Sequence, residues 1–429
     1  MQWLSMTVIG CYKTESENVI HAYTTTSKYA ILAESEMRNP MKIKLFYILH
    51  EHDGHKREFQ YPIYIKLRNE LMKRHTFPSV RHLEVIRTPI ISIKRNKLLN
   101  VAYHLVIGTI DGIMITTLEN FISTDQEPLT VWKHDNMNDV INCVYCQSHK
   151  NGTIEIVMGT VLGKIIDISF NVRHGKFTKM NETRNSSVLQ KCQQLMNDSI
   201  ISVNGLRDVN DGANFKTSKD DELWVRNSIT EALVFGCFDN YLYGIIDGKV
   251  ENQCCYENVN NISNLASSPS DMNQERLGSL ETSNNMSDHI LTDVDFVIAK
   301  QYSSSSLRFY VANVTNIGCI LYRRTNRGEW DKLRVFKRYT HSEKSPQVNC
   351  RLQLLPTSNE LQIFSGSEDG KLFQWRYDYI NDTVISKIVS INNQATTVHS
   401  LSFQGPNKLF FVERYSDKSS LGYFDLLLI

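Results

Sequence analysis

A short hairpin pattern recurs along this chain and constrains its fold more than any other feature. Its clearest copy, residues 365–376, reads as two strands joined by an Asp-Gly turn, and Asp-Gly is a strong hairpin signal. Weaker copies occupy residues 107–115, 158–166 and 235–243. Hairpin units repeated with long spacers are typical of radial or stacked architectures, so the pattern predicts an all-β repeat fold.

The strands expected around the clearest hairpin make a complete repeat unit. They span residues 348–355, 361–364, 371–376 and 383–389, with turn-forming residues between them. Four meandering antiparallel strands of this length are one blade of a β-propeller. Comparable groups of strands elsewhere bring the count to seven. We therefore predict a single domain over residues 1–429, a seven-bladed β-propeller of four-stranded antiparallel blades.

The two ends of the chain are expected to share a blade. Strands predicted at 397–403, 408–412 and 421–426 make three, and the apolar segment 6–9 supplies the fourth. A candidate first blade follows at 19–48. Closure of this kind removes exposed sheet edges and leaves loops and faces for partners.

The hairpin pattern also assigns individual positions. Glycine and aspartate supply the backbone conformations that tight turns need, and a tryptophan ends the strand after the clearest turn. The structural turn positions predicted in this way are Gly108, Asp111, Gly112, Gly159, Gly163, Gly236, Asp239, Gly366, Asp369, Gly370 and Trp375.

Uneven spacing of the repeats predicts long polar loop insertions. The longest, about 251–288, is rich in Asn, Ser and charge and has almost no periodic apolar signal. Such a composition buries too little apolar surface to offset its ordering entropy, so disorder is expected there. Smaller polar insertions are expected at about 171–194 and 208–222, and one short helix is expected at 64–74, before Pro78.

Composition excludes several classes of protein. The 47 basic and 46 acidic residues nearly cancel, which gives no overall electrostatic signature for nucleic acid or an anionic membrane. Nine cysteines, mostly single and inside apolar runs, favour reduced thiols in an intracellular, cytoplasmic protein. No apolar run approaches the roughly 20 residues that a transmembrane helix needs.

Candidate catalytic and metal-binding motifs are weak. Cys143 and Cys146 match half of a zinc site, but a strand places them on opposite or poorly matched faces, so buried cysteines are the favoured interpretation. The histidines His50, His52 and His55 surround an Asp-Gly dipeptide, which favours a solvated turn. Nucleophile elbows, Walker loops and zincin motifs do not occur. The sequence therefore predicts no catalytic residue, no cofactor, no metal ligand and no small-molecule substrate, and hence no enzyme.

Basic residues gather in two stretches, 66–97 and 323–338. The simpler interpretation is a solvated rim of the propeller. The functional one is a surface for an acidic partner such as a filament, a phospholipid headgroup or nucleic acid. On that interpretation the partner-binding candidates are Lys66, Arg68, Lys73, Arg74, Arg323, Arg324 and Arg327.

The segment 366–375 resembles a WD-repeat hairpin. Asp369 stands at the usual turn aspartate and Trp375 at the usual strand-end tryptophan. The Gly-His dipeptide of that family and its full Trp-Asp ending are missing, so the likeness is to divergent WD-repeat-like propellers.

A narrower likeness is to the kaptin family of divergent propellers. The layout of 307–377 is similar to it, especially 311–313 running on to 320–328, and the phrases at 233–237 and 18–47 are placed comparably. The resemblance implies a subunit of KICSTOR, which recruits GATOR to lysosomes and restrains mTOR signalling when amino acids are scarce. It also implies an actin association and a place at the lysosomal surface reached through partners. No binding residue carries over.

Three functions remain open from the sequence. The first is a non-catalytic scaffold in a multiprotein complex. The second is a substrate-receptor or nucleic-acid-associated propeller that uses the two basic stretches, for which binding would weaken steeply with salt. The third is an enzyme that uses the central funnel of the ring, which would need ionisable residues converging at one funnel mouth.

Overall fold

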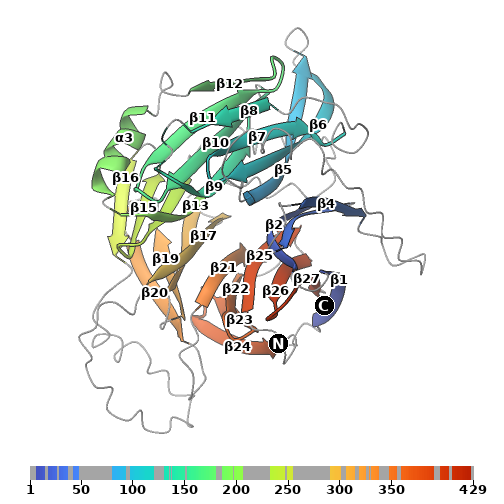
Figure 1. Ribbon diagram of the computed structural model, residues 1–429. Helices are drawn as coiled ribbons and strands as arrows, with labels where there is room; N and C mark the ends of the chain where they lie inside the picture. The colour runs from blue at the N-terminus through green and yellow to red at the C-terminus, as the bar shows by residue number, and fades with distance from the viewer. Residues whose placement is uncertain are drawn as a thin grey trace, which may run out of the picture.

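A computed structural model gives the structure of the chain (Figure 1). The residues it describes are 6–14, 18–26, 29–36, 42–47, 80–92, 97–119, 130–134, 136, 138–149, 152–179, 186–196, 198–205, 232–246, 249–254, 290–300, 306–314, 318–324, 328, 330–337, 347–354, 359–390, 397–404 and 408–426. The predicted helix at 64–74, the histidines at 50–55 and the predicted insertion at 208–222 lie outside these ranges.

The described part of the chain is built from antiparallel sheets, six of them four-stranded. Each of these six is a propeller blade that meanders in chain order, except that the last takes its fourth strand from the N-terminus. Blade 2 is β5 (Val80–Ser92), β6 (Lys97–Thr109), β7 (Gly112–Thr117) and β8 (Thr130–Lys133). Blade 3 is β9 (Ile141–Ser148), β10 (Thr153–Thr160), β11 (Ile165–Asn171) and β12 (Lys176–Lys179). Blade 4 is β13 (Ile200–Gly205), β14 (Ala232–Cys237), β15 (Tyr241–Ile246) and β16 (Lys249–Cys254).

The remaining strands continue the same order. Blade 5 is β17 (Leu291–Lys300), β18 (Ser306–Val314), β19 (Gly318–Arg324) and β20 (Trp330–Lys337). Blade 6 is β21 (Gln347–Leu354), β22 (Glu360–Ser367), β23 (Lys371–Asp378) and β24 (Thr383–Ser390). Blade 7 is β25 (Thr397–Gln404), β26 (Lys408–Arg414), β27 (Ser419–Leu426) and β1 (Met6–Lys13).

The first predicted blade has only three strands in the described residues. This sheet, called sheet 1 here, is β2 (Asn18–Thr25), β3 (Tyr29–Glu36) and β4 (Lys42–Tyr47). The structure thus has six four-stranded blades, not the seven predicted, because the chain that follows β4 lies outside the described residues.

The sheets follow one another around an axis (Figure 1). The first strand of each sheet contacts the first strand of the next, from β2 through β5, β9, β13, β17 and β21 to β25, and β25 returns to β2. The ring is therefore closed, which is the propeller architecture that the hairpin repeat predicts.

The two ends of the chain complete one blade together. Strand β1 pairs antiparallel with β27, with Met6 opposite Leu426 and Ile9 opposite Tyr423. Thr14 extends this pairing, because its Oγ1 accepts a hydrogen bond of 2.8 Å from the amide of Ser419. The N-terminal strand thus covers an edge of β27 that would otherwise be open.

Each hydrophobic core cluster lies between two neighbouring sheets. In β6, Leu105 and Ile107 pack toward sheet 1, whereas Val106 packs toward blade 3. Alternate residues of a strand point to opposite faces, so a strand that is covered on both faces buries side chains at successive positions. The first four residues of β7 are buried in this way, and so are all eight residues of β22.

The repeated glycines mark close contacts between blades. A Cβ added at Gly366 would lie 2.3 Å from the carbonyl oxygen of Val398 on the next blade. At Gly159 it would lie 2.5 Å from Ile200 on the next blade, and at Gly236 2.4 Å from Leu291. A side chain at these positions would collide with the first strand of the following blade, with its backbone at Gly366 and with its side chains at Gly159 and Gly236.

The structure places the other predicted hairpin positions as follows. Asp111, Asp239 and Asp369 lie in the tight turns between the second and third strands of their blades. Gly163 and Gly370 adopt φ values of 74° and 72°, which suit glycine, and Gly112 begins β7. Trp375 lies within β23, not at its end, and is buried against the aromatic rings of blades 5 and 6.

Two predicted insertions need correction. Residues 251–254 belong to β16 and pair with β15, so any loop begins later than residue 251. The segment 171–194 holds β12 and most of helix α3 (Ser186–Leu195). Despite its polar composition, the segment forms a helix that buries Cys192 between blades 3 and 4, and Met196 just beyond the helix end is buried there too. Cys192 and Met196 are four positions apart, and this spacing of apolar residues could have indicated a helix.

Candidate functional site

Carboxylates of β17 join three blades near the centre of the ring. Asp293 accepts hydrogen bonds from the Ser202 hydroxyl on β13 (2.8 Å) and from the Cys350 amide on β21 (3.1 Å). Asp295 accepts one from Asn204 on β13 and one of 2.8 Å from the Leu352 amide on β21. These two side chains therefore connect the first strands of blades 4, 5 and 6.

A guanidinium completes this network. Arg351 Nη1 lies 2.6 Å from Asp293 Oδ2 and also donates to the Cys350 carbonyl. Burial lowers the pKa of Arg351, but the carboxylates of Asp293 and Asp295 outweigh it and the net shift is upward. The charged side chains of Asp293, Asp295 and Arg351 interact with one another and connect the blades. An enzyme that used the central funnel would instead need ionisable residues that converge at the funnel mouth.

A second buried ion pair joins blades 4 and 5. Arg324 donates to both carboxylate oxygens of Glu251, which also accepts a hydrogen bond of 2.7 Å from the Trp330 indole. Burial raises the pKa of Glu251, but the hydrogen bonds from Arg324 and Trp330 hold it below its usual value. Arg324 is 4% exposed, so its prediction as a partner-binding residue is wrong: it binds a carboxylate of its own chain.

Two other arginines of the second basic stretch, Arg323 and Arg334, also face carboxylates. Arg323 Nη2 lies 2.8 Å from Asp331 in the same blade. Arg334 Nη2 lies 2.7 Å from Asp382 in blade 6. Arg327, Lys66, Arg68, Lys73 and Arg74 lie outside the described residues. The described part of the stretch 323–338 is thus largely neutralised within the protein.

Buried thiols and imidazoles are poorly suited to catalysis. Burial raises the pKa of Cys192 and of Cys319 to about 12, and the thiolate rather than the thiol is the nucleophile. Burial lowers the pKa of His104 and of His399 to about 4, so both imidazoles are neutral at pH 7. These groups fit structural roles.

Cys143 and Cys146 lie on opposite faces of β9. Cys143 packs with residues of blade 4, and its thiol lies 3.7 Å from the Ile200 carbonyl. Cys146 packs instead in the core between blades 2 and 3. The two thiols therefore do not share a site, as their spacing in a strand predicts.

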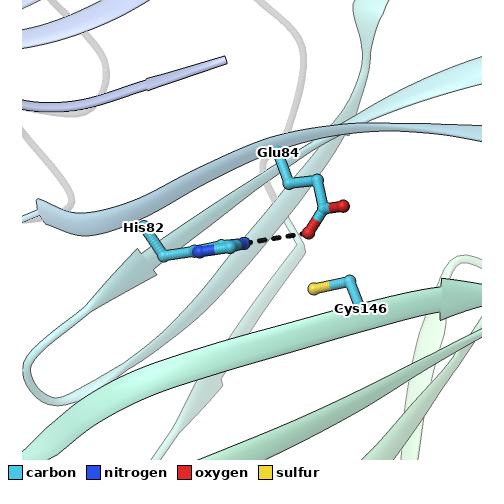
Figure 2. Close-up of side chains that lie close together, drawn as sticks. All are labelled: His82, Glu84 and Cys146. Carbon is cyan, nitrogen blue, oxygen red and sulfur yellow. Dashed lines mark hydrogen bonds and ion pairs between the residues drawn. The ribbon is translucent and has the colours of Figure 1, made fainter. Parts of the chain in front are cut away.

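Cys146 instead lies beside His82 and Glu84 of β5 (Figure 2). The ligand atoms of the three side chains all lie within 4.8 Å of one another, and His82 Nε2 is 3.1 Å from Glu84 Oε2. Cys146 is buried, whereas His82 and Glu84 are 23% and 28% exposed. Sequence reasoning missed this group because Cys146 comes from another blade and is more than 60 positions from His82 and Glu84.

Large apolar side chains are exposed around the α3–β13 connection. Val161 and Leu162 form the β10–β11 turn, Phe238 lies in the β14–β15 turn, and Leu195 ends α3; their exposed fractions are 44%, 57%, 48% and 46%. We call these four residues the α3 face. Both turns join second to third strands, so they lie on the same face of the ring as the connection from β12 to β13.

Backbone contacts bring the α3 face together. An added Cβ at Gly163 would lie 2.6 Å from the carbonyl oxygen of Asp198, which places the β10–β11 turn against the connection. The Phe238 amide donates a hydrogen bond of 2.9 Å to the Ser199 carbonyl. The Tyr243 hydroxyl donates to the Leu195 carbonyl at 3.2 Å. These contacts place the β10–β11 turn and the β14–β15 turn against the same connection, next to the end of α3.

Comparison with known proteins leaves the family open. No family model and no curated protein sequence matches the chain. Among solved structures, a crystal structure of BBS1N in complex with ARL6DN, soaked with mercury, matches with a TM-score of 0.47 and 12% identity over 98% of this chain and 97% of that one. A lead-soaked crystal of the same complex gives the same values. The sheet order and the contacts that close the ring show the propeller fold.

Within the described residues, no helix combines the length and hydropathy needed to cross a membrane.

Proposed function

We propose that this protein is a non-catalytic β-propeller that serves as a scaffold in a multiprotein complex, with the α3 face as its docking surface. The observation that carries the proposal is the gathering of Val161, Leu162, Leu195 and Phe238 at one position on the ring. Exposed apolar residues that stand singly are common, but a group of them marks an interaction surface.

The chemistry of the turns supports this assignment. Tight turns usually carry polar residues, whereas the two turns here present Val-Leu and Phe to solvent. Fully burying one such side chain is worth about 1.5–3 kcal/mol. A partner that covered Leu162 and Phe238 would therefore gain a large part of its binding free energy from these two residues.

The kaptin resemblance supplies a specific candidate complex. On this proposal the protein is a KICSTOR subunit that recruits GATOR to lysosomes, restrains mTOR signalling and associates with actin. This narrower version rests on the sequence phrases at 307–377, 233–237 and 18–47 alone. A seventh blade built on sheet 1 belongs to the same proposal.

Affinity purification tests the scaffold directly. The tagged wild-type chain is compared with the double variant Leu162→Asp/Phe238→Asp, and co-purifying proteins are quantified by mass spectrometry. Ile380→Asp is the matched control, because Ile380 is 61% exposed and lies in the β23–β24 turn on the opposite face of the ring. Circular dichroism confirms that each variant is folded.

The expected result is a set of stoichiometric partners that the wild type and Ile380→Asp retain and the double variant loses. Recovery of the wild-type protein alone would overturn the scaffold, and partners retained by the double variant would overturn the α3 face. Partners that include no KICSTOR subunit would remove the kaptin-like version only.

A further inference from the structure

The His82, Glu84 and Cys146 group has the composition of a transition-metal site. Imidazole nitrogen, carboxylate oxygen and thiolate sulfur are the three ligand types that Zn²⁺ takes in proteins. Among the described residues this is the one group of three or more His, Cys, Asp or Glu side chains whose ligand atoms approach one another this closely.

The backbone places two of the ligands on the same side. His82 and Glu84 are two positions apart in β5, so both point toward blade 3. Leu83, between them, packs on the opposite side against sheet 1. Cys146 comes from β9, which neighbours β5 in the ring. The group therefore spans the junction of blades 2 and 3 (Figure 2).

Gly108, the strand partner of His82, leaves room for the His82 side chain. A Cβ added at Gly108 would lie 3.0 Å from the His82 Cβ and 3.1 Å from Val144. The glycine that permits blade contact elsewhere in the ring thus also allows His82 to sit between blades 2 and 3.

The distances suit a metal after small movements. Two bonds of about 2.1 Å at a tetrahedral angle separate their ligand atoms by about 3.4 Å, and His82 Nε2 and Glu84 Oε2 are 3.1 Å apart. A zinc-bound sulfur lies about 3.6 Å from the other ligand atoms. The Cys146 thiol must therefore approach by at most about 1.2 Å, which a change in its side-chain torsion can supply.

We propose that His82, Glu84 and Cys146 bind a divalent transition metal, Zn²⁺ in the cell, that clamps blade 2 to blade 3. The cation takes the place of the hydrogen bond between His82 and Glu84, and Cys146 binds as the thiolate after losing its proton to solvent. Three protein ligands leave a fourth position for water. The partly exposed sides of His82 and Glu84 provide the route of entry. This inference is independent of the α3 face.

Cobalt substitution tests the site on the full chain. The reduced protein is stripped of metal by a chelator, dialysed and titrated with Co²⁺, which reports thiolate ligation through a sulfur-to-cobalt absorption band in the near ultraviolet. The variants are Cys146→Ser and His82→Gln. Cys143→Ser is the control, because it removes a thiol from the other face of the same strand.

The expected result is one Co²⁺ per chain with the thiolate band in wild type and Cys143→Ser. Both Cys146→Ser and His82→Gln should lose the band and bind Zn²⁺ at least about 100-fold more weakly in chelator competition, since even outer-shell changes cost 10–100-fold. Zn²⁺ should raise the melting temperature of wild type and Cys143→Ser only.

The proposal is overturned if wild type shows no thiolate band, or if the band survives in Cys146→Ser. If Cys146→Ser fails to fold, His82→Gln decides, because His82 is partly exposed and its replacement leaves the core between blades 2 and 3 intact.

Discussion

Replacing Gly366 by alanine should disrupt the contact between blades 6 and 7. The new Cβ would lie 2.3 Å from the Val398 carbonyl oxygen and 2.9 Å from Asn349 Oδ1. An ordinary contact needs at least about 3.4 Å, so the backbones of the two blades must separate by about 1 Å. Overpacking of this kind costs about 1–3 kcal/mol. The movement also breaks the 3.3 Å hydrogen bond that the Asn349 side-chain amide donates across the junction to the Val398 carbonyl, which adds about 1 kcal/mol.

A total of about 3 kcal/mol is measurable by calorimetry. The unfolding entropy is about 2.1 cal/mol/K per residue, which gives about 0.9 kcal/mol/K for the whole chain of 429 residues. A loss of about 3 kcal/mol should therefore lower the melting temperature by about 3 °C. Gly244→Ala is the matched control, because its Cβ would come no closer than 3.2 Å to the Ile246 side chain and 3.8 Å to the Leu233 carbonyl oxygen. Equal melting temperatures for Gly366→Ala and Gly244→Ala would refute the close-contact explanation of the repeat.

Two further predictions concern buried polar groups. Burial lowers the pKa of His104 from 6.5 to about 4, so the unfolded chain binds a proton that the folded chain does not, and the free energy of unfolding should fall by about 3 kcal/mol as the pH falls from about 6.5 to 4. Urea unfolding across that range should show a weaker pH dependence in His104→Gln, and an unchanged dependence would contradict the assignment. Asp295→Ala leaves the Leu352 amide and Asn204 without their carboxylate acceptor and should lower the free energy of unfolding by about 2–3 kcal/mol. A loss under about 0.5 kcal/mol would show that water replaces the carboxylate.

The sequence predicted the blades well because their turns are local. The conformation of an Asp-Gly turn such as Asp369-Gly370 depends on adjacent residues, so a short segment of sequence is enough to predict it. The same holds for the strands of the last blade, whose N-terminal partner was predicted from a single apolar segment and pairs as expected.

Contacts between blades could not be predicted in the same way. Glu251 appeared to open a long polar loop, whereas it lies in β16, the last strand of blade 4, and binds Arg324 more than 70 positions away. Arg324 was therefore predicted to be an exposed, partner-binding residue. His82 and Cys146 likewise meet only once the ring is closed. Charge and ligand pairing across blades depend on the ring geometry, which no short window of sequence contains.

Cross-linking of the two chain ends tests the closed ring most directly. Thr7 and Asp425 are partners across β1 and β27, and both are polar residues. Partner residues in a strand pair lie close enough for a disulfide. Oxidised Thr7→Cys/Asp425→Cys should give the mapped intramolecular disulfide in high yield by peptide mass spectrometry. The control Thr7→Cys/Ser420→Cys should not, because Ser420 pairs with Lys13 at the other end of the strand. Absence of the disulfide in Thr7→Cys/Asp425→Cys, or equal yields from both pairs, would contradict the ring.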